Sequence, residues 1–222
     1  MLPPDRLEEG TRELAIATTI PLAACGDQND EEPSADLPQG CEEIEAPNPK
    51  PEQVRRPGPA LLHDESITAV VRTTCGTFEI TLDTVKFAKT ASSFAHLVEQ
   101  GFYDGTSVSY IDGSVVQGGD PAGDRTGGPG YSVDEAVPFD TEYTRGIVAM
   151  AKTETEPIGR SGSQFFVVYA ADAGLQPQFA VLGKITAGIE VIDRIAELRE
   201  PGSDTGEPLA PVAIDRITLQ NP

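Results

Sequence analysis

Hydrophobic and polar positions alternate along much of the last two thirds of the chain. Phe78, Ile80 and Leu82 are separated by polar residues, and this period of two is typical of a half-buried β-strand. The apolar segment 69–73 is its expected partner in a hairpin that turns near Cys75. The pattern therefore predicts antiparallel sheet structure.

Two segments follow the helical period instead. The first is expected to begin near Thr90 as its capping residue and to end before Gly101. Its apolar face consists of Phe94, Leu97 and Val98. The second is expected over 188–199, and a closing strand over 211–219. The apolar face of the second helix consists of Ile189, Ile192, Ile195 and Ala196. Between the helices, segment 103–184 is rich in glycine and short β-branched runs, so we expect a mainly β fold in which two helices cap a closed antiparallel barrel.

Charge and composition exclude several classes of partner and cofactor. The 36 acidic and 16 basic side chains give a formal charge of −20, which repels phosphate backbones, so nucleic acid is not an expected partner. Two histidines and three scattered cysteines do not have the spacing of metal ligands, and we expect no cofactor. No apolar run reaches the roughly 18 residues of a membrane span.

Residues 1–25 resemble the export signal of a bacterial lipoprotein. An apolar run follows Arg12, and Leu22-Ala23-Ala24-Cys25-Gly26 resembles the lipobox, in which processing leaves a lipidated Cys25 as the first residue. The segment before the run is acidic, although such signals are usually basic. The alternative is a small buried helix that ends near Pro21. The lipoprotein interpretation predicts an exported protein anchored through lipid to the outer face of the bacterial cell membrane.

Residues 26–65 are rich in Pro, Asp and Glu and poor in aromatic side chains. Such a segment buries too little apolar surface to offset the entropy of ordering, so we expect a disordered tether before a domain at 66–222. Cys41 lies in the tether and Cys75 near the first strand. In an exported protein these two are expected to form a disulfide, whereas two free thiols are the alternative in a cytosolic protein.

Three runs carry the family resemblance: Gln117-Gly118-Gly119-Asp120-Pro121, Thr126-Gly127-Gly128-Pro129-Gly130-Tyr131 and Gly162-Ser163-Gln164-Phe165-Phe166-Val167-Val168. In this order and at this spacing they resemble the cyclophilin-type peptidyl-prolyl cis–trans isomerases, over residues 67–219. The resemblance implies a closed eight-stranded barrel. It also implies a monomer that binds proline-containing polypeptides and assists the folding of exported proteins.

The resemblance also assigns roles to individual residues. Gln117 corresponds to the glutamine that holds the peptide backbone, and Ala151 with Lys152 to the strand that pairs with the bound peptide. The expected pocket consists of Gln164, Phe166, Leu175, Val115 in place of a methionine, and Phe179 in place of a histidine. Without the resemblance, Phe166 would be equally compatible with the core. Phe165 is expected in the core because alternation places it on the opposite face.

The segment 108–114 departs from the family pattern. Tyr110 stands where the catalytic arginine is usual, the segment is one residue shorter, and the nearest arginine is Arg125. Ser114 replaces a pocket phenylalanine and Gly174 a tryptophan. Because a phenolic hydroxyl is a weaker donor than a guanidinium, we expect a weak isomerase with Tyr110 in the catalytic position. The alternatives are a non-catalytic surface lipoprotein that binds proline peptides and one whose groove is vestigial.

Overall fold

The computed structural model describes residues 37–50, 53–58, 62, 66–203 and 205–221. The expected signal segment 1–25 with Cys25, and the first part of the expected tether, lie outside the described residues. Within the described part of the chain, no helix is long and apolar enough to cross a bilayer.

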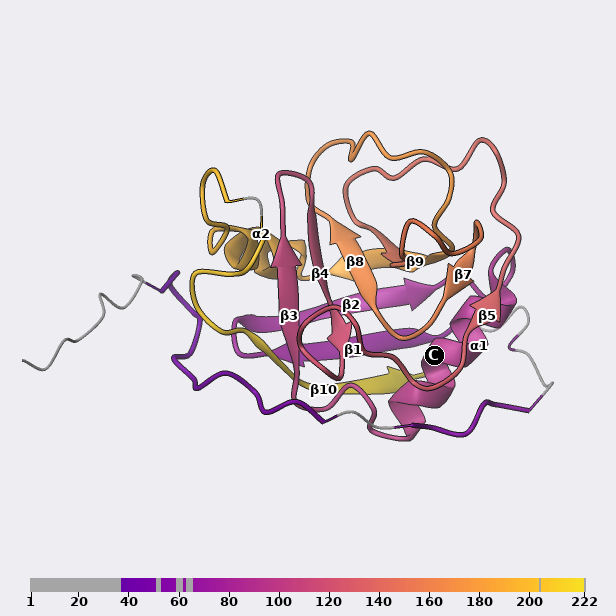
Figure 1. Cartoon of the computed structure of the whole chain (residues 1–222), viewed down its shortest axis with the longest axis horizontal. Helices are drawn as coiled ribbons and strands as arrows, with labels where there is room; N and C mark the ends of the chain where they lie inside the picture. The colour runs from indigo at the N-terminus through magenta and orange to yellow at the C-terminus, as the bar shows by residue number, and fades with distance from the viewer. Residues whose placement is uncertain (1–36, 51–52, 59–61, 63–65, 204, 222) are drawn as a thin grey trace, which may run out of the picture. The chain divides into compact units, whose positions relative to one another are not determined.

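The described elements are, in order, β1 (Thr68–Thr73), β2 (Gly76–Leu82), α1 (Ala88–Glu99), β3 (Thr106–Ile111), β4 (Val115–Asp120), β5 (Val133–Asp134), β6 (Ile147–Met150), β7 (Arg160–Ser161), β8 (Phe165–Val168), β9 (Val181–Ala187), α2 (Ile189–Ala196) and β10 (Ala213–Gln220). Eight of these strands form a closed antiparallel barrel in the order β1-β10-β3-β4-β8-β6-β9-β2, whereas β5 and β7 pair with each other. Figure 1 shows the barrel with α1 and α2 at opposite ends. The predicted mainly β barrel with two helices is confirmed.

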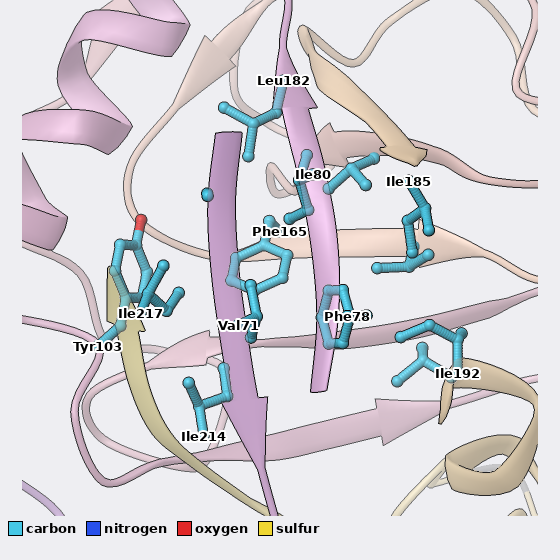
Figure 2. Packing of buried hydrophobic residues seen from close by; sticks show 14 of the residues in the cluster. Val71, Phe78, Ile80, Tyr103, Phe165, Leu182, Ile185, Ile192, Ile214 and Ile217 are labelled. Atoms are coloured by element: carbon cyan, nitrogen blue, oxygen red, sulfur yellow. The ribbon is translucent and has the colours of Figure 1, made fainter. Parts of the chain in front are cut away.

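The interior of the barrel is filled by the alternating apolar residues. Phe78, Ile80 and Leu82 are all buried, as the period-two pattern predicts. Figure 2 shows Phe78 and Ile80 beside Phe165 of β8, together with Ile192 of α2. Burial of this continuous apolar cluster is the main stabilising contribution to the fold.

The helix ends differ from the prediction in detail. Helix α1 begins at Ala88, and Thr90 is a buried residue of its first turn, so the predicted Thr90 cap is wrong. A carboxylate from a distant loop caps the helix instead, because Oε2 of Glu135 accepts hydrogen bonds from Lys89 N and Thr90 N at 2.8 and 3.2 Å. The predicted end at Gly101, with φ of 66°, is confirmed. Helix α2 ends three residues before the expected boundary.

Residues 37–50 and 53–58, which we call the strap, lie against the barrel. Three strap N–H groups donate to carbonyl oxygens of the domain: Glu42 to Thr74 at 2.8 Å, Lys50 to Pro121 at 2.8 Å, and Val54 to Pro129 at 2.9 Å. In Figure 1 the strap runs in indigo along one side of the barrel. For these residues the expectation of a disordered tether is wrong, because backbone hydrogen bonds and a covalent link supply what the composition lacks.

The covalent link is a disulfide between Cys41 of the strap and Cys75 in the β1–β2 turn, with an S–S distance of 2.01 Å. From α2, the guanidinium of Arg194 donates to the carbonyl oxygen of Cys75 at 2.5 Å. The start of the strap is thereby joined to the same turn that the second helix contacts.

We predict that replacing Cys41 and Cys75 together with serine lowers the free energy of unfolding by about 3–4 kcal/mol. The reason is that the bond closes a loop with a sequence separation of 34 residues, which restricts the unfolded chain. Urea unfolding of the oxidised protein and the double variant measures the difference. Mass spectrometry that finds two free thiols at these positions in the protein purified under oxidising conditions would contradict the prediction.

Candidate functional site

One row of side chains crosses the outer face of four neighbouring strands. The registers pair Tyr110 with Gln117, Gln117 with Phe166, and Phe166 with Ala149. Directly paired residues of adjacent strands point to the same face of a sheet. Phe165, one residue earlier in β8, packs inside the barrel, as predicted. The row therefore lies on the outer face of the same four strands whose inner face packs against the core.

A second apolar cluster lies on this outer face, and we call it the outer cluster. Its buried members are Phe87, Val115, Tyr143, Ala149, Phe166, Val168, Ala180 and Val181. Tyr110, Ala151 and Phe179 pack against it as partly buried residues. The rings of Phe166 and Phe179 meet edge to face with centroids 5.3 Å apart. Thus the structure brings together Val115, Phe166 and Phe179, which the sequence assigned to one pocket.

Tyr143 fixes the position of Phe179. Its hydroxyl donates to the Phe179 carbonyl oxygen at 2.7 Å and accepts from the Phe179 N–H at 2.9 Å. Burial raises the pKa of Tyr143, so the phenol stays neutral and can do both. Sequence reasoning missed this residue, because its partner is 36 positions away.

A cavity of about 900 Å³ opens beside the outer cluster. Four of the residues that the sequence assigned to the site line it: Gln117, Ala151, Lys152 and Gln164. The opposite wall is the glycine-rich segment 125–132. Leu175 does not line this cavity and is 36% exposed in the loop that precedes Phe179. The assigned residues therefore divide between an apolar cluster and a polar cavity next to it.

Two glutamine side chains connect the barrel wall to the far side of the cavity. Nε2 of Gln117 donates to Oε1 of Gln164 at 2.9 Å. Nε2 of Gln164 donates in turn to the carbonyl oxygens of Arg125 and Gly127, at 3.1 and 2.9 Å. The amides are thus hydrogen-bonded structural groups, as polar residues on apolar strands usually are, and they also present polar atoms to the cavity.

Asp120 also holds the segment 122–127 through hydrogen bonds to its backbone. Its buried carboxylate accepts the N–H groups of Ala122 at 3.0 Å and Arg125 at 2.5 Å. A Cβ atom at Gly127 would lie 2.2 Å from Oδ1 of Asp120, so the close approach requires glycine there. Gly118, Gly119 and Asp120 are the last residues of β4, so the strand itself carries the carboxylate to the cavity wall.

Arg125 has a left-handed backbone conformation, with φ of 69°. Among the described residues other than glycine, it is the one with a positive φ. This conformation costs a side-chain-bearing residue about 1–2 kcal/mol relative to the right-handed region. Its guanidinium carbon lies 5.2 Å from the ring centroid of Tyr110, within cation–π range. A guanidinium from the loop after β4 therefore lies against the ring of Tyr110.

The Tyr110 hydroxyl points toward Asp112 at 3.4 Å from Oδ2, a distance longer than an ordinary O–H···O hydrogen bond. Burial, and then the charge of Asp112, raise the pKa of Tyr110, so the phenol is neutral. Gly206 covers the ring, because a Cβ atom there would lie 2.2 Å from it. Tyr110 thus presents its ring to Arg125.

The remaining substituted positions are polar or open. Ser114 lies in the β3–β4 turn, where its N–H and hydroxyl donate to Oδ1 of Asp112 at 2.7 and 2.9 Å. A Cβ atom at Gly174 would have no described neighbour within 4 Å, so no wall stands there. Lys152 donates to the carbonyl oxygens of Thr153 and Glu156, at 3.0 and 3.3 Å. The described residues contain no group of three or more His, Cys, Asp or Glu that could hold a metal ion.

A closed eight-stranded barrel with two helices and a site on its outer face defines a class of folds that includes the cyclophilins. The model of the cyclophilin-type peptidyl-prolyl cis–trans isomerase family matches residues 68–219, and the chain belongs to this family.

Two individual relatives illustrate the match to this family. The chain is 33% identical to the probable peptidyl-prolyl cis-trans isomerase B of Mycobacterium tuberculosis, with 84% of this chain and 66% of that protein covered. It is 34% identical to the protein of the same name from Mycobacterium leprae, with 77% and 62% covered. The chain therefore spans slightly less than two thirds of the length of these relatives.

A solved structure has the same architecture. The crystal structure of a cyclophilin-type isomerase from Cryptosporidium parvum, determined in the presence of the dipeptide Ala-Pro, superposes with a TM-score of 0.61. The two sequences are 25% identical, and the match covers 70% of this chain and 99% of that one.

We predict that Tyr143→Phe lowers the free energy of unfolding by about 1–3 kcal/mol, because the N–H and carbonyl oxygen of Phe179 lose their partner. It should also weaken the binding of an Ala-Pro peptide, since Phe179 is no longer held against Phe166. Urea unfolding and an NMR titration measure the two effects. Tyr103→Phe is the matched control, because that hydroxyl donates to Ser163 inside the barrel. A Tyr143→Phe variant that loses stability but keeps the affinity of the control would refute the role in positioning Phe179.

Proposed function

We propose that the protein is a peptidyl-prolyl cis–trans isomerase that acts on proline-containing polypeptides as a monomer and with low activity. The observation that carries this proposal is the contact of Phe166 with Phe179 beside a cavity bordered by Gln117 and Gln164. An apolar face suits a proline ring, and neighbouring amides suit the peptide groups on either side of it.

The reaction requires no nucleophile and no metal ion. Rotation about a peptide bond has a barrier of about 18–20 kcal/mol, because the twisted state loses amide resonance. A catalyst lowers the barrier by binding the twisted state more tightly than the planar one. Fixed apolar contacts to the ring and fixed donors to the flanking carbonyl groups are sufficient in kind, and the site has residues of both types.

Two features support low activity. The hydroxyl of Tyr110 is directed toward Asp112, away from a role as a strong donor. Ser114 and Gly174 leave the rim without the large apolar groups that would cover a proline ring, and buried apolar area contributes about 25 cal/mol per Å². Both binding and rate enhancement are therefore expected to be reduced.

A second candidate is a module that binds proline-containing segments without catalysis. The hydrogen-bonded pair Gln117 and Gln164 favours it, because a preformed polar grip on a peptide backbone works without any donor to the proline nitrogen. Both candidates predict binding of a proline-containing peptide, and only the isomerase predicts turnover of the X-Pro bond.

We predict turnover at least about tenfold below that of a family member with the complete motif, because the apolar area missing at Ser114 and Gly174 no longer stabilises the bound, twisted proline. Exchange NMR on the peptide Ala-Ala-Pro-Phe measures isomerisation directly, and a titration with the same peptide measures binding. Turnover comparable to a complete member would contradict the low activity. Saturable binding without turnover selects the binding module, and absence of both indicates a vestigial groove.

We further propose that the protein is exported and that its mature chain begins at a lipidated Cys25, assisting the folding of exported proteins at the outer face of the cell membrane. The disulfide between Cys41 and Cys75 supports this compartment, because such bonds persist where the environment is oxidising.

Stable anchoring requires more than one acyl chain, since a single chain binds membranes only marginally. We predict that Cys25→Ser leaves the precursor unprocessed or releases the protein from the membrane fraction. Cell fractionation with mass spectrometry of the N-terminus measures this. A soluble protein that retains Met1 would rule out the anchor.

A further inference from the structure

We propose that Arg125 is the catalytic donor of this site and that Tyr110 is the positioning residue on which its guanidinium rests. The inference builds on the proposed isomerase function. As the X-Pro bond twists, the lone pair of the proline nitrogen leaves resonance and becomes an acceptor, and an N–H of the guanidinium can donate to it. No covalent bond forms or breaks, and no proton is transferred.

The position of the guanidinium supports this role first. Its carbon lies 5.2 Å from the centroid of the Tyr110 ring, and Tyr110 is the direct neighbour of Gln117 across β3 and β4. Gln117 is in turn the neighbour of Phe166 across β4 and β8. Arg125 and Gln117 line the same cavity. The guanidinium of Arg125 therefore lies beside Tyr110, at the border between the outer cluster and the cavity that Gln117 lines.

The backbone of Arg125 is held on both sides. Its N–H donates to the buried carboxylate of Asp120 at 2.5 Å, and its carbonyl oxygen accepts from Gln164 at 3.1 Å. The point from which the side chain extends is therefore fixed relative to the cavity, and the Tyr110 ring is the contact that limits where the guanidinium lies.

The left-handed conformation of Arg125 supports the role independently. At φ of 69° glycine would be unstrained, and the chain uses glycine at many other positive φ values, including Gly123 and Gly130 of the same segment. A strained backbone that keeps a long cationic side chain beside a cavity points to a use for that side chain.

The other candidate cations have hydrogen-bond or ionic partners. The ammonium of Lys152 lies 5.7 Å from the ring centroid of Phe179 and donates to the carbonyl oxygens of Thr153 and Glu156, so two of its three N–H groups are used. Arg160 forms an ion pair with Asp134 at 2.8 Å. By contrast, the described residues include no ion-pair partner for Arg125, and no described side chain accepts a hydrogen bond from its guanidinium, whose carbon lies 5.2 Å from the Tyr110 ring centroid.

The test compares Arg125→Gln, Arg125→Lys and Arg125→Gly in the full chain, with Ala-Ala-Pro-Phe as the probe. For Arg125→Gln we expect kcat/KM from exchange NMR to fall about 100-fold, whereas the Kd of the peptide changes less than about threefold. Arg125→Lys should retain part of the activity. Arg125→Gly should be as inactive as Arg125→Gln but have a higher thermal midpoint, because the strain is relieved. Arg72→Gln, which removes the same charge from an exposed position of β1, is the matched control.

The variants Tyr110→Phe and Tyr110→Ala separate the ring from the hydroxyl. If the ring supports Arg125, the phenylalanine variant should recover most of the activity that the alanine variant loses. If Tyr110→Phe loses as much turnover as Arg125→Gln, the hydroxyl is the donor and the assignment to Arg125 is overturned.

The remaining outcomes are distinct. Unchanged turnover in Arg125→Gln overturns the role of Arg125 and leaves the isomerase function intact. A loss in which Kd rises by the same factor as kcat/KM falls shows that Arg125 only binds the peptide, which also overturns the proposal. A wild-type protein without any turnover overturns the isomerase function and the donor role together.

Discussion

The strands on one side of the barrel pack against one apolar cluster on their inner face and against a second on their outer face. The rest of the structure depends on this constraint. Along β8, Phe165 packs into the closed interior and Phe166 into the outer cluster. Because side chains alternate strictly across a strand, the register that seals the core also determines which residues face the site. A shift of one residue in β8 would turn Phe166 and Val168 into the interior and Phe165 and Val167 to the outer face, so neither cluster would keep its present packing.

The segment between β4 and β5 depends on that wall for its position. Asp120 at the end of β4 holds Ala122 and Arg125 through their N–H groups, while Gln164 at the start of β8 holds Arg125 from the other side. The strap adds contacts at both ends of the segment, with hydrogen bonds to the carbonyl oxygens of Pro121 and Pro129. The disulfide fixes the start of the strap. In the oxidised protein the strap therefore helps to hold the segment 121–129, whose residues 125–129 line the cavity.

Local pattern in the sequence predicted the regular elements, whereas features that depend on tertiary contact were missed. The alternation at Phe78 to Leu82 and the glycine at Gly101 were sufficient for the barrel strand and the helix end. Thr90 was a wrong cap because the actual cap, Glu135, lies 45 positions away. Gln117, Gln164 and Phe166, which the family resemblance assigned to the site, lie near one another because they belong to or border neighbouring strands. The resemblance could not find Tyr143 or the contact of Arg125 with Tyr110, since both join segments whose spacing carries no periodic signal. The strap was missed because composition alone does not register backbone hydrogen bonds to a preformed surface.

A crystal structure of the full chain with an Ala-Ala-Pro-Phe peptide would show whether the outer cluster and its cavity receive a proline and the peptide groups around it. We expect the proline ring against Phe166 and Phe179, with the neighbouring backbone over Gln117 and within hydrogen-bond reach of Arg125. A peptide bound at another surface, for example between the strap and α1, with the outer cluster empty, would contradict this assignment of the site.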